Sequence, residues 1–88
     1  MQTTNECYVC RKTGVLHTHE VFFGSANRKK SIKWGCQVRL CPKHHNMSSE
    51  GVHFNHELDT RLKRECQYKF ELLYGHEIFM KEFGKNNL

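Results

Sequence analysis

Residues 41–46 read CPKHHN, in which two adjacent histidines, His44 and His45, follow a cysteine, a proline and a lysine. Adjacent residues point about 100° apart on a helix and to opposite faces on a strand, so one small site rarely uses both. One histidine can be a metal ligand, while the other is a solvated surface residue or belongs to a different site. Pro42 suits the first position of a short helix, where its missing N–H removes no hydrogen bond.

A second pair of potential ligands lies near the start of the chain. Cys7-x2-Cys10 and Cys41-x2-His44 have the same spacing, and each pair can turn both side chains toward one ion. Such a Cys3His set suits tetrahedral structural zinc. The alternatives are unliganded buried cysteines with a surface histidine, or a redox Cys-x2-Cys, which would need a thioredoxin-like βαβ pattern that the sequence lacks. The sequence therefore predicts a structural zinc site.

The composition indicates a small domain that needs more than a hydrophobic core. The chain has 88 residues, 38% of them hydrophobic, and a domain of this size is marginal unless a metal, disulfides or a partner stabilise it. The five cysteines are an odd number, which argues against a complete disulfide framework and favours a reducing compartment. We find no signal-peptide pattern and no run of membrane-spanning length, so we expect a cytoplasmic protein with no membrane partner.

The formal net charge is +5, and much of the excess precedes CPKHHN. The residues concerned are Arg28, Lys29, Lys30, Lys33 and Arg39. A basic run is usually a solvated loop, but beside a metal site the same charges can neutralise phosphates. This pattern favours nucleic acid as the partner, with DNA first and RNA not excluded.

Two strands are predicted before CPKHHN. Residues 15–23, VLHTHEVFF, and residues 34–40, WGCQVRL, are rich in β-branched and aromatic side chains. Val38 and Leu40 fall on one face of the second strand. Residues 24–33 read as a polar, basic loop between the strands.

Two helices are predicted in the second half of the chain. Apolar residues recur every three or four positions from about residue 56 to 74, which indicates an amphipathic helix. Its apolar stripe is Leu58, Leu62, Cys66, Phe70 and Leu73, so Cys66 should be a core residue. Gly75 is suited to ending this helix, and a shorter helix should follow and end at Gly84. The predicted fold class is α+β, as one domain over residues 1–88.

Several stretches taken together resemble the HNH endonucleases, the ββα-metal or His-Me finger nucleases, and in particular the small HNH-type proteins often encoded by bacteriophages and prophages. The stretches are HEVFFG (19–24), NRKKS (27–31), LCPKHH (40–45), GVHFN (51–55) and FGKN (83–86). The likeness covers nearly the whole chain. It implies a zinc-stabilised ββα-metal core over about residues 5–50 and a C-terminal helical extension over about residues 56–84.

The family carries one catalytic divalent ion between its hairpin and the following helix. By this resemblance His19 and His45 match ligands of that ion, which could be Mg²⁺, Mn²⁺, Ni²⁺ or Zn²⁺. His53 matches a third ligand or a phosphate contact. His44 would then face the zinc and His45 the catalytic ion. The middle asparagine of the family name has no clear match, since Cys36 lies near its expected position.

The resemblance also implies catalytic roles. Glu20 occupies the position of the family's usual catalytic histidine, so it is the expected general base. If Glu20 binds the metal instead, His17 or His19 becomes the base. Arg28 and Lys29 are expected to neutralise the charge that develops on the phosphate.

The function implied is a metal-dependent nuclease that hydrolyses DNA phosphodiester bonds with little sequence preference, because its contacts would be to the backbone. One alternative is a non-catalytic zinc-binding nucleic-acid module, which would have no need of the His19-Glu20 pair. Another is a zinc-stabilised protein-interaction adaptor, which requires exposed apolar residues on the helices over residues 56–83. A homodimer would be needed to cut both strands efficiently, and a larger phage protein assembly is a further partner.

Overall fold

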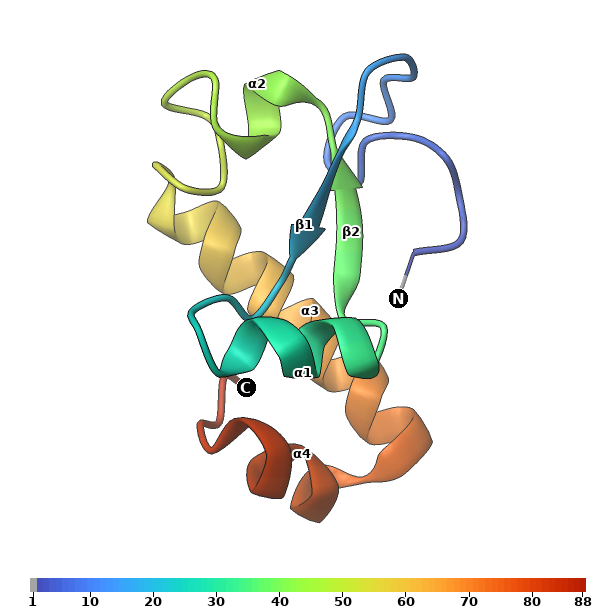
Figure 1. The fold of residues 1–88 in the computed structure, drawn as a ribbon, viewed down its shortest axis with the longest axis vertical. Helices are drawn as coiled ribbons and strands as arrows, with labels where there is room; N and C mark the ends of the chain where they lie inside the picture. Colours follow the sequence, from blue (N-terminus) through green and yellow to red (C-terminus); the bar gives the residue numbers. More distant parts are fainter. Residues whose placement is uncertain (1) are drawn as a thin grey trace.

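The computed structural model describes residues 2–88, which form a small α+β domain with one two-stranded sheet (Figure 1). The strands are His17–Glu20 (β1) and Gln37–Leu40 (β2). The helices are Asn27–Lys33 (α1), Pro42–His45 (α2), His56–Tyr74 (α3) and His76–Phe83 (α4). Among the described residues, no helix combines the length and the apolar character needed to cross a membrane.

The two strands pair in antiparallel fashion. His17 lies opposite Leu40 and His19 lies opposite Val38. Residues directly opposite one another share a face of the sheet, so both histidines lie on the same face as Val38 and Leu40. Both aliphatic residues are buried. The hairpin therefore turns two histidines toward the interior.

The connection between the strands is a helix, so the prediction of a basic loop over residues 24–33 was wrong. The only apolar side chain of α1 is Ile32, which is half exposed, so no amphipathic pattern could indicate a helix. Ser31 fixes the helix to the sheet through its buried hydroxyl. That hydroxyl donates to the Phe22 carbonyl at 2.6 Å and accepts the Phe22 N–H at 3.1 Å.

Both strands are shorter than the predicted ranges 15–23 and 34–40. Phe22 bonds to the serine of α1 instead of extending the ladder. Trp34 caps α1, so β2 begins only after that helix has ended. Val21, Phe22 and Cys36 lie outside the ladder but still pack in the core, which is why composition alone indicated longer strands.

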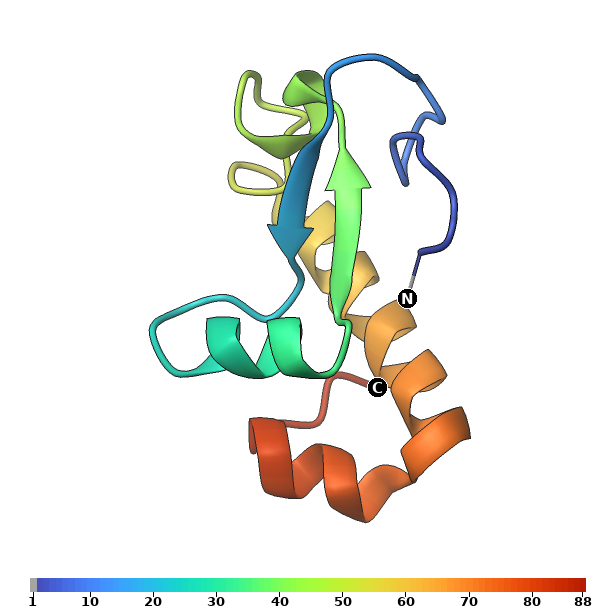
Figure 2. The same cartoon turned by 45° about the vertical axis from the view of Figure 1, so that its right-hand side comes forward.

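The long helix α3 has the predicted limits. Asn55 caps it by accepting the N–H of Leu58, and the buried part of its apolar stripe is Leu58, Leu62, Cys66 and Phe70. Cys66 is thus a core residue, as predicted. Leu73 was expected on the same stripe but is 76% exposed. The last turn of α3 extends past the sheet, toward the reversal into α4 (Figure 2).

An aromatic cluster closes the core where α4 returns beneath α1. The rings of Phe79 and Phe83 lie 5.5 and 4.5 Å from the ring of Phe22, and Phe70 lies 5.3 Å from Phe79. Gly75 ends α3 with φ +90°, a conformation that favours glycine, and allows the reversal. This packing occupies one end of the molecule and leaves the other end to α2 and the neighbouring loops (Figure 1).

Candidate metal centres

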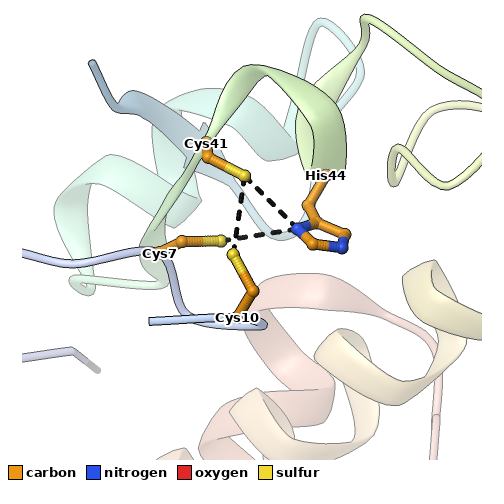
Figure 3. Close-up of side chains that lie close together, drawn as sticks. All are labelled: Cys7, Cys10, Cys41 and His44. Atoms are coloured by element: carbon orange, nitrogen blue, oxygen red, sulfur yellow. Dashed lines mark hydrogen bonds between the residues drawn. The ribbon is translucent and has the colours of Figure 1, made fainter. Parts of the chain in front are cut away.

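The first candidate centre joins the N-terminal loop to the junction of β2 and α2 (Figure 3). Its members are Cys7, Cys10, Cys41 and His44, whose ligand atoms all lie within 4.8 Å of one another. The Sγ atoms of Cys10 and Cys41 are 3.7 Å apart. The His44 Nδ1 atom is 3.3 Å from the Cys41 Sγ atom and 3.8 Å from the Cys7 Sγ atom. We call this the Cys3His cluster, and it could hold a structural metal ion.

The backbone at the Cys3His cluster favours the ligand form of the first cysteine. Burial raises the pKa of the Cys7 thiol, but hydrogen bonds from the backbone of Cys41, Cys10 and Val9 outweigh burial and bring the pKa to about 6. The thiolate is the form of cysteine that binds metals. Cys7 is therefore prepared to bind a cation at neutral pH.

Two hydrogen bonds of Tyr8 link the Cys3His cluster to β2 and to α3. Its amide donates to the Arg39 carbonyl at 2.8 Å, and its hydroxyl donates to the Glu65 carboxylate on α3 at 2.9 Å. Burial and the Glu65 carboxylate raise the pKa of Tyr8 to about 12. The phenol thus remains a neutral hydrogen-bond donor over the physiological range.

The second candidate centre consists of three histidines from three segments: His19 on β1, His45 on α2 and His53 in the following turn. Their nitrogen atoms lie within 4.8 Å of one another, and the two Nε2 atoms of His45 and His53 are 3.2 Å apart. His19 is 2% exposed, and its Nε2 atom has no hydrogen-bond partner within residues 2–88. A buried polar atom without a partner is unfavourable, and a bound ion would satisfy it. This three-histidine cluster could hold a metal ion.

The surroundings of His19 and His45 favour their neutral forms. Burial, together with the neighbouring histidines, lowers the pKa of His19 to about 4 and also lowers the pKa of His45. The carboxylate of Asp59 acts on the pKa of His19 in the opposite direction but is outweighed. Neutral imidazole is the form that binds metals.

The adjacent histidines of CPKHHN thus belong to different clusters. The Cys41 carbonyl accepts the N–H groups of both His44 and His45, so the single turn of α2 begins at the cysteine ligand. The turn separates the two side chains by about 100°, which sends one to the Cys3His cluster and the other to the three-histidine cluster.

Gly51 brings the third histidine into place. A Cβ atom at this position would lie 2.7 Å from the backbone oxygen of His45, so only glycine permits this approach. The chain then runs back along α2, where the Val52 N–H donates to the His44 carbonyl and the His53 N–H donates to the His45 carbonyl. The GVHFN stretch therefore contributes its glycine to this site as well as its histidine.

The three-histidine cluster opens onto a cavity of about 430 Å³ that Glu20 and Arg28 also line. The Arg28 Nε atom donates to the Glu20 carboxylate at 3.0 Å, and the two side chains are 70% and 15% exposed. A larger cavity of about 860 Å³ lies between the N-terminal segment and α3, but no histidine lines it among the described residues. The smaller cavity combines a carboxylate and a guanidinium with all three members of the three-histidine cluster.

The remaining basic residues of the predicted nucleic-acid surface lie in different places. Lys29 is exposed on α1. Lys30 donates to the backbone carbonyl of Glu82, and Lys33 pairs with the carboxylate of the same residue at 3.4 Å, so both lie against α4. Arg39 donates to a backbone carbonyl of the N-terminal segment at 3.2 Å. The structure therefore brings only Arg28 of this set to the cavity.

Two neighbours of the three-histidine cluster, Phe23 and Asp59, were not predicted as site residues. Phe23 lines the cavity, its ring 5.9 Å from that of His19 and 5.6 Å from that of His53. The Lys63 ammonium lies over the Phe23 ring, 4.5 Å from its centroid. Asp59 has a buried Oδ1 atom with no hydrogen-bond partner within residues 2–88. An acid in the first turn of a helix is common, so no sequence pattern distinguishes Asp59.

Comparisons of the chain with protein-family models, with curated proteins and with solved structures found no match. The geometry of the two clusters is therefore the basis for a functional proposal.

Proposed function

We propose that the protein is a metal-dependent nuclease of the HNH, ββα-metal type that hydrolyses DNA phosphodiester bonds with little sequence preference. The observation that carries this proposal is the three-histidine cluster, which opens onto a cavity lined by Glu20 and Arg28. Three protein ligands beside an open cavity are typical of a catalytic metal site, whereas four protein ligands are typical of a structural one. An antiparallel hairpin followed by a short histidine-bearing helix agrees with the arrangement that the sequence resemblance implies.

Zinc is the ion we propose for the Cys3His cluster. Tetrahedral zinc, with bonds of about 2.3 Å to sulfur and 2.0 Å to nitrogen, separates two sulfurs by about 3.8 Å and a sulfur from a nitrogen by about 3.5 Å. The observed separations are 3.7 Å between sulfurs and 3.3 and 3.8 Å between sulfur and nitrogen. Reduced thiolates of this kind are expected in a cytoplasmic protein.

The cavity residues have distinct roles in this proposal. His19, His45 and His53 would hold the divalent ion, and an all-imidazole set favours Ni²⁺ or Zn²⁺ over Mg²⁺. When bound, such an ion supplies charge stabilisation to the phosphate and to the leaving oxygen. Glu20 accepts the proton of the attacking water. Arg28, whose exposed guanidinium can leave its ion pair, donates to a phosphate oxygen.

Plasmid nicking tests the proposal. Supercoiled DNA is incubated with the protein and Mg²⁺, Mn²⁺, Ni²⁺ or Zn²⁺, with EDTA as the metal-free arm. His53→Ala removes one ligand from an exposed turn and should abolish nicking without unfolding the protein. His76→Ala, on α4, is the matched control and should nick at the wild-type rate. Nicking that persists in EDTA, or that is equal in His53→Ala and wild type, would contradict the proposal.

A second candidate function is protein binding through α3 and α4, including self-association. Five large apolar residues of these helices are between 41% and 76% exposed: Tyr68, Leu72, Leu73, Tyr74 and Ile78. Exposed apolar side chains beyond those that fill the core are what an adaptor or a homodimer requires. Light scattering on wild type and on the Leu72→Glu, Leu73→Glu double variant tests self-association. A wild-type dimer that the double variant converts to a monomer would support it, and a monomeric wild type would exclude it.

A further inference from the structure

A fourth histidine contacts the three-histidine cluster from outside the cavity. His17 lies on β1, two residues before His19 and on the same face of the hairpin. Its Nδ1 atom is 2.9 Å from the Nδ1 atom of His45, with the two rings edge to face at 74°. Within residues 2–88, His17 is not among the residues that line the cavity. It therefore contacts one ligand candidate through the ring nitrogen that does not face His53.

The 2.9 Å contact restricts where the ring protons can lie. Two imidazole nitrogens form a hydrogen bond only when one carries a proton and the other offers a lone pair. The other ring nitrogen of His45, Nε2, lies 3.2 Å from the Nε2 atom of His53, and only an unprotonated Nε2 can bind an ion. A neutral His45 with a free Nε2 carries its proton on Nδ1 and donates it to His17 Nδ1. His17 then keeps its own proton on Nε2.

We propose that His17 is a positioning residue: by accepting the Nδ1–H of His45, it selects the tautomer and ring orientation that present His45 Nε2 to the ion of the three-histidine cluster. This inference rests on the proposed function. Metal-bound histidines usually donate their second ring N–H to a carboxylate, a backbone carbonyl or water, and such partners raise metal affinity. Here a second imidazole takes that place. The same contact assigns His17 a role other than general base, because its Nδ1 lone pair is engaged by His45.

The test starts from protein that carries one zinc per chain, in the Cys3His cluster, and measures its affinity for Co²⁺ through the visible absorption of the bound ion. His17→Phe keeps an aromatic ring without nitrogens, and His17→Asn keeps an acceptor near the position of Nδ1. We expect His17→Phe to weaken Co²⁺ binding roughly 10- to 100-fold and His17→Asn to restore most of the affinity. His76→Gln, a histidine replacement on α4, should bind Co²⁺ as wild type does. Zinc content and melting temperature should be the same in all four proteins.

Three other outcomes would overturn the role of His17. If His17→Phe binds Co²⁺ as tightly as wild type, the positioning role is wrong while the metal centre stands. If wild type itself binds no Co²⁺ beyond its zinc, the proposed function and this inference fall together. If His17→Phe and His17→Asn both keep Co²⁺ affinity but no longer nick plasmid DNA, His17 transfers a proton itself. His17→Leu replaces His17→Phe in the comparison should the phenyl ring lower the melting temperature.

Discussion

The Cys3His cluster and the three-histidine cluster share helix α2 but differ in their donors and in their access to solvent. The first gathers three sulfurs and one nitrogen, two of the four donors coming from the N-terminal loop. The second gathers three nitrogens from β1, α2 and the turn that follows, and it opens onto a cavity of about 430 Å³. Four donors complete a tetrahedral site, whereas three leave a position for water or substrate. We therefore expect one cluster to stabilise the fold and the other to perform chemistry.

The largest effect should come from removing a sulfur of the Cys3His cluster. Structural zinc in small domains contributes roughly 10–16 kcal/mol, about as much as the whole stability of a typical domain. Cys41→Ser should therefore lose zinc and show no cooperative melting by circular dichroism. His53→Ala, which removes a donor from the other cluster, is the control and should melt close to wild type. A chelated, zinc-free wild type with an unchanged melting curve would refute the structural role.

A large effect on rate alone is expected from Glu20→Gln. An amide cannot accept the proton of water, so nicking should slow by roughly 10² to 10⁴-fold, the usual contribution of a general base. Melting temperature and zinc content should not change, because a surface ion pair with Arg28 contributes little. Glu50→Gln, an exposed glutamate that pairs with Lys43, is the matched control. Full activity in Glu20→Gln would place the base at another residue.

A moderate effect is expected on DNA binding. Removing one basic side chain that neutralises a phosphate should lower the slope of log affinity against log salt by about 1. Arg28→Ala and Lys29→Ala should each flatten the slope, measured by fluorescence anisotropy on a DNA duplex. Lys33→Ala should flatten it less, because Lys33 lies against Glu82 of α4. If the Arg28→Ala, Lys29→Ala double variant keeps the wild-type slope, these two side chains contact solvent and do not neutralise DNA phosphates.

The smallest effect concerns the hydrogen bond between Tyr8 and Glu65, which links the Cys3His cluster to α3. Tyr8→Phe removes the hydrogen bond to Glu65 and should lower the free energy of unfolding by about 0.5–1.5 kcal/mol, with zinc retained. Tyr68→Phe, at an exposed position on α3, should have no measurable effect.

The hydrogen bond between Tyr8 and Glu65 should also make the stability of the fold depend on pH. The pKa of Tyr8 is raised to about 12 in the folded chain, above the value of about 10 in the unfolded chain. The bond therefore stabilises the fold fully below about pH 10, and its contribution disappears as the pH rises through about 12. Absorbance at 295 nm should show one of the three tyrosines ionising later than the other two. Simultaneous ionisation of all three would show that the phenol is not held by Glu65.

The parts of the fold that the sequence predicted are those set by local spacing. Two ligand pairs of equal spacing, a proline at the start of α2, a period of three to four over α3 and a glycine after it are all present in the structure. Helix α1 was missed because a buried Ser31 hydroxyl, rather than an apolar stripe, fixes it to the sheet. Leu73 was misplaced because the apolar period continues to a position that residues 2–88 leave exposed.

The candidate site was predicted only where neighbouring motifs defined it. His19, His45 and His53 each belong to a recognisable stretch, and the structure brings them together. The contact of His17 with His45 depends on the register of the hairpin relative to α2, which no local pattern encodes. The basic residues form a run in the sequence, but the turn of α1 directs Lys30 toward α4 and away from the cavity.

The most direct test of this account compares His44→Ala with His45→Ala in one set of measurements: zinc content, melting temperature and plasmid nicking. We expect His44→Ala to lose zinc and to melt far below wild type, because His44 Nδ1 completes the Cys3His cluster. We expect His45→Ala to keep its zinc and its fold but no longer to nick DNA, because His45 belongs to the three-histidine cluster. Equal loss of zinc and of fold in the two variants would contradict this account, since the two adjacent histidines would then serve one site.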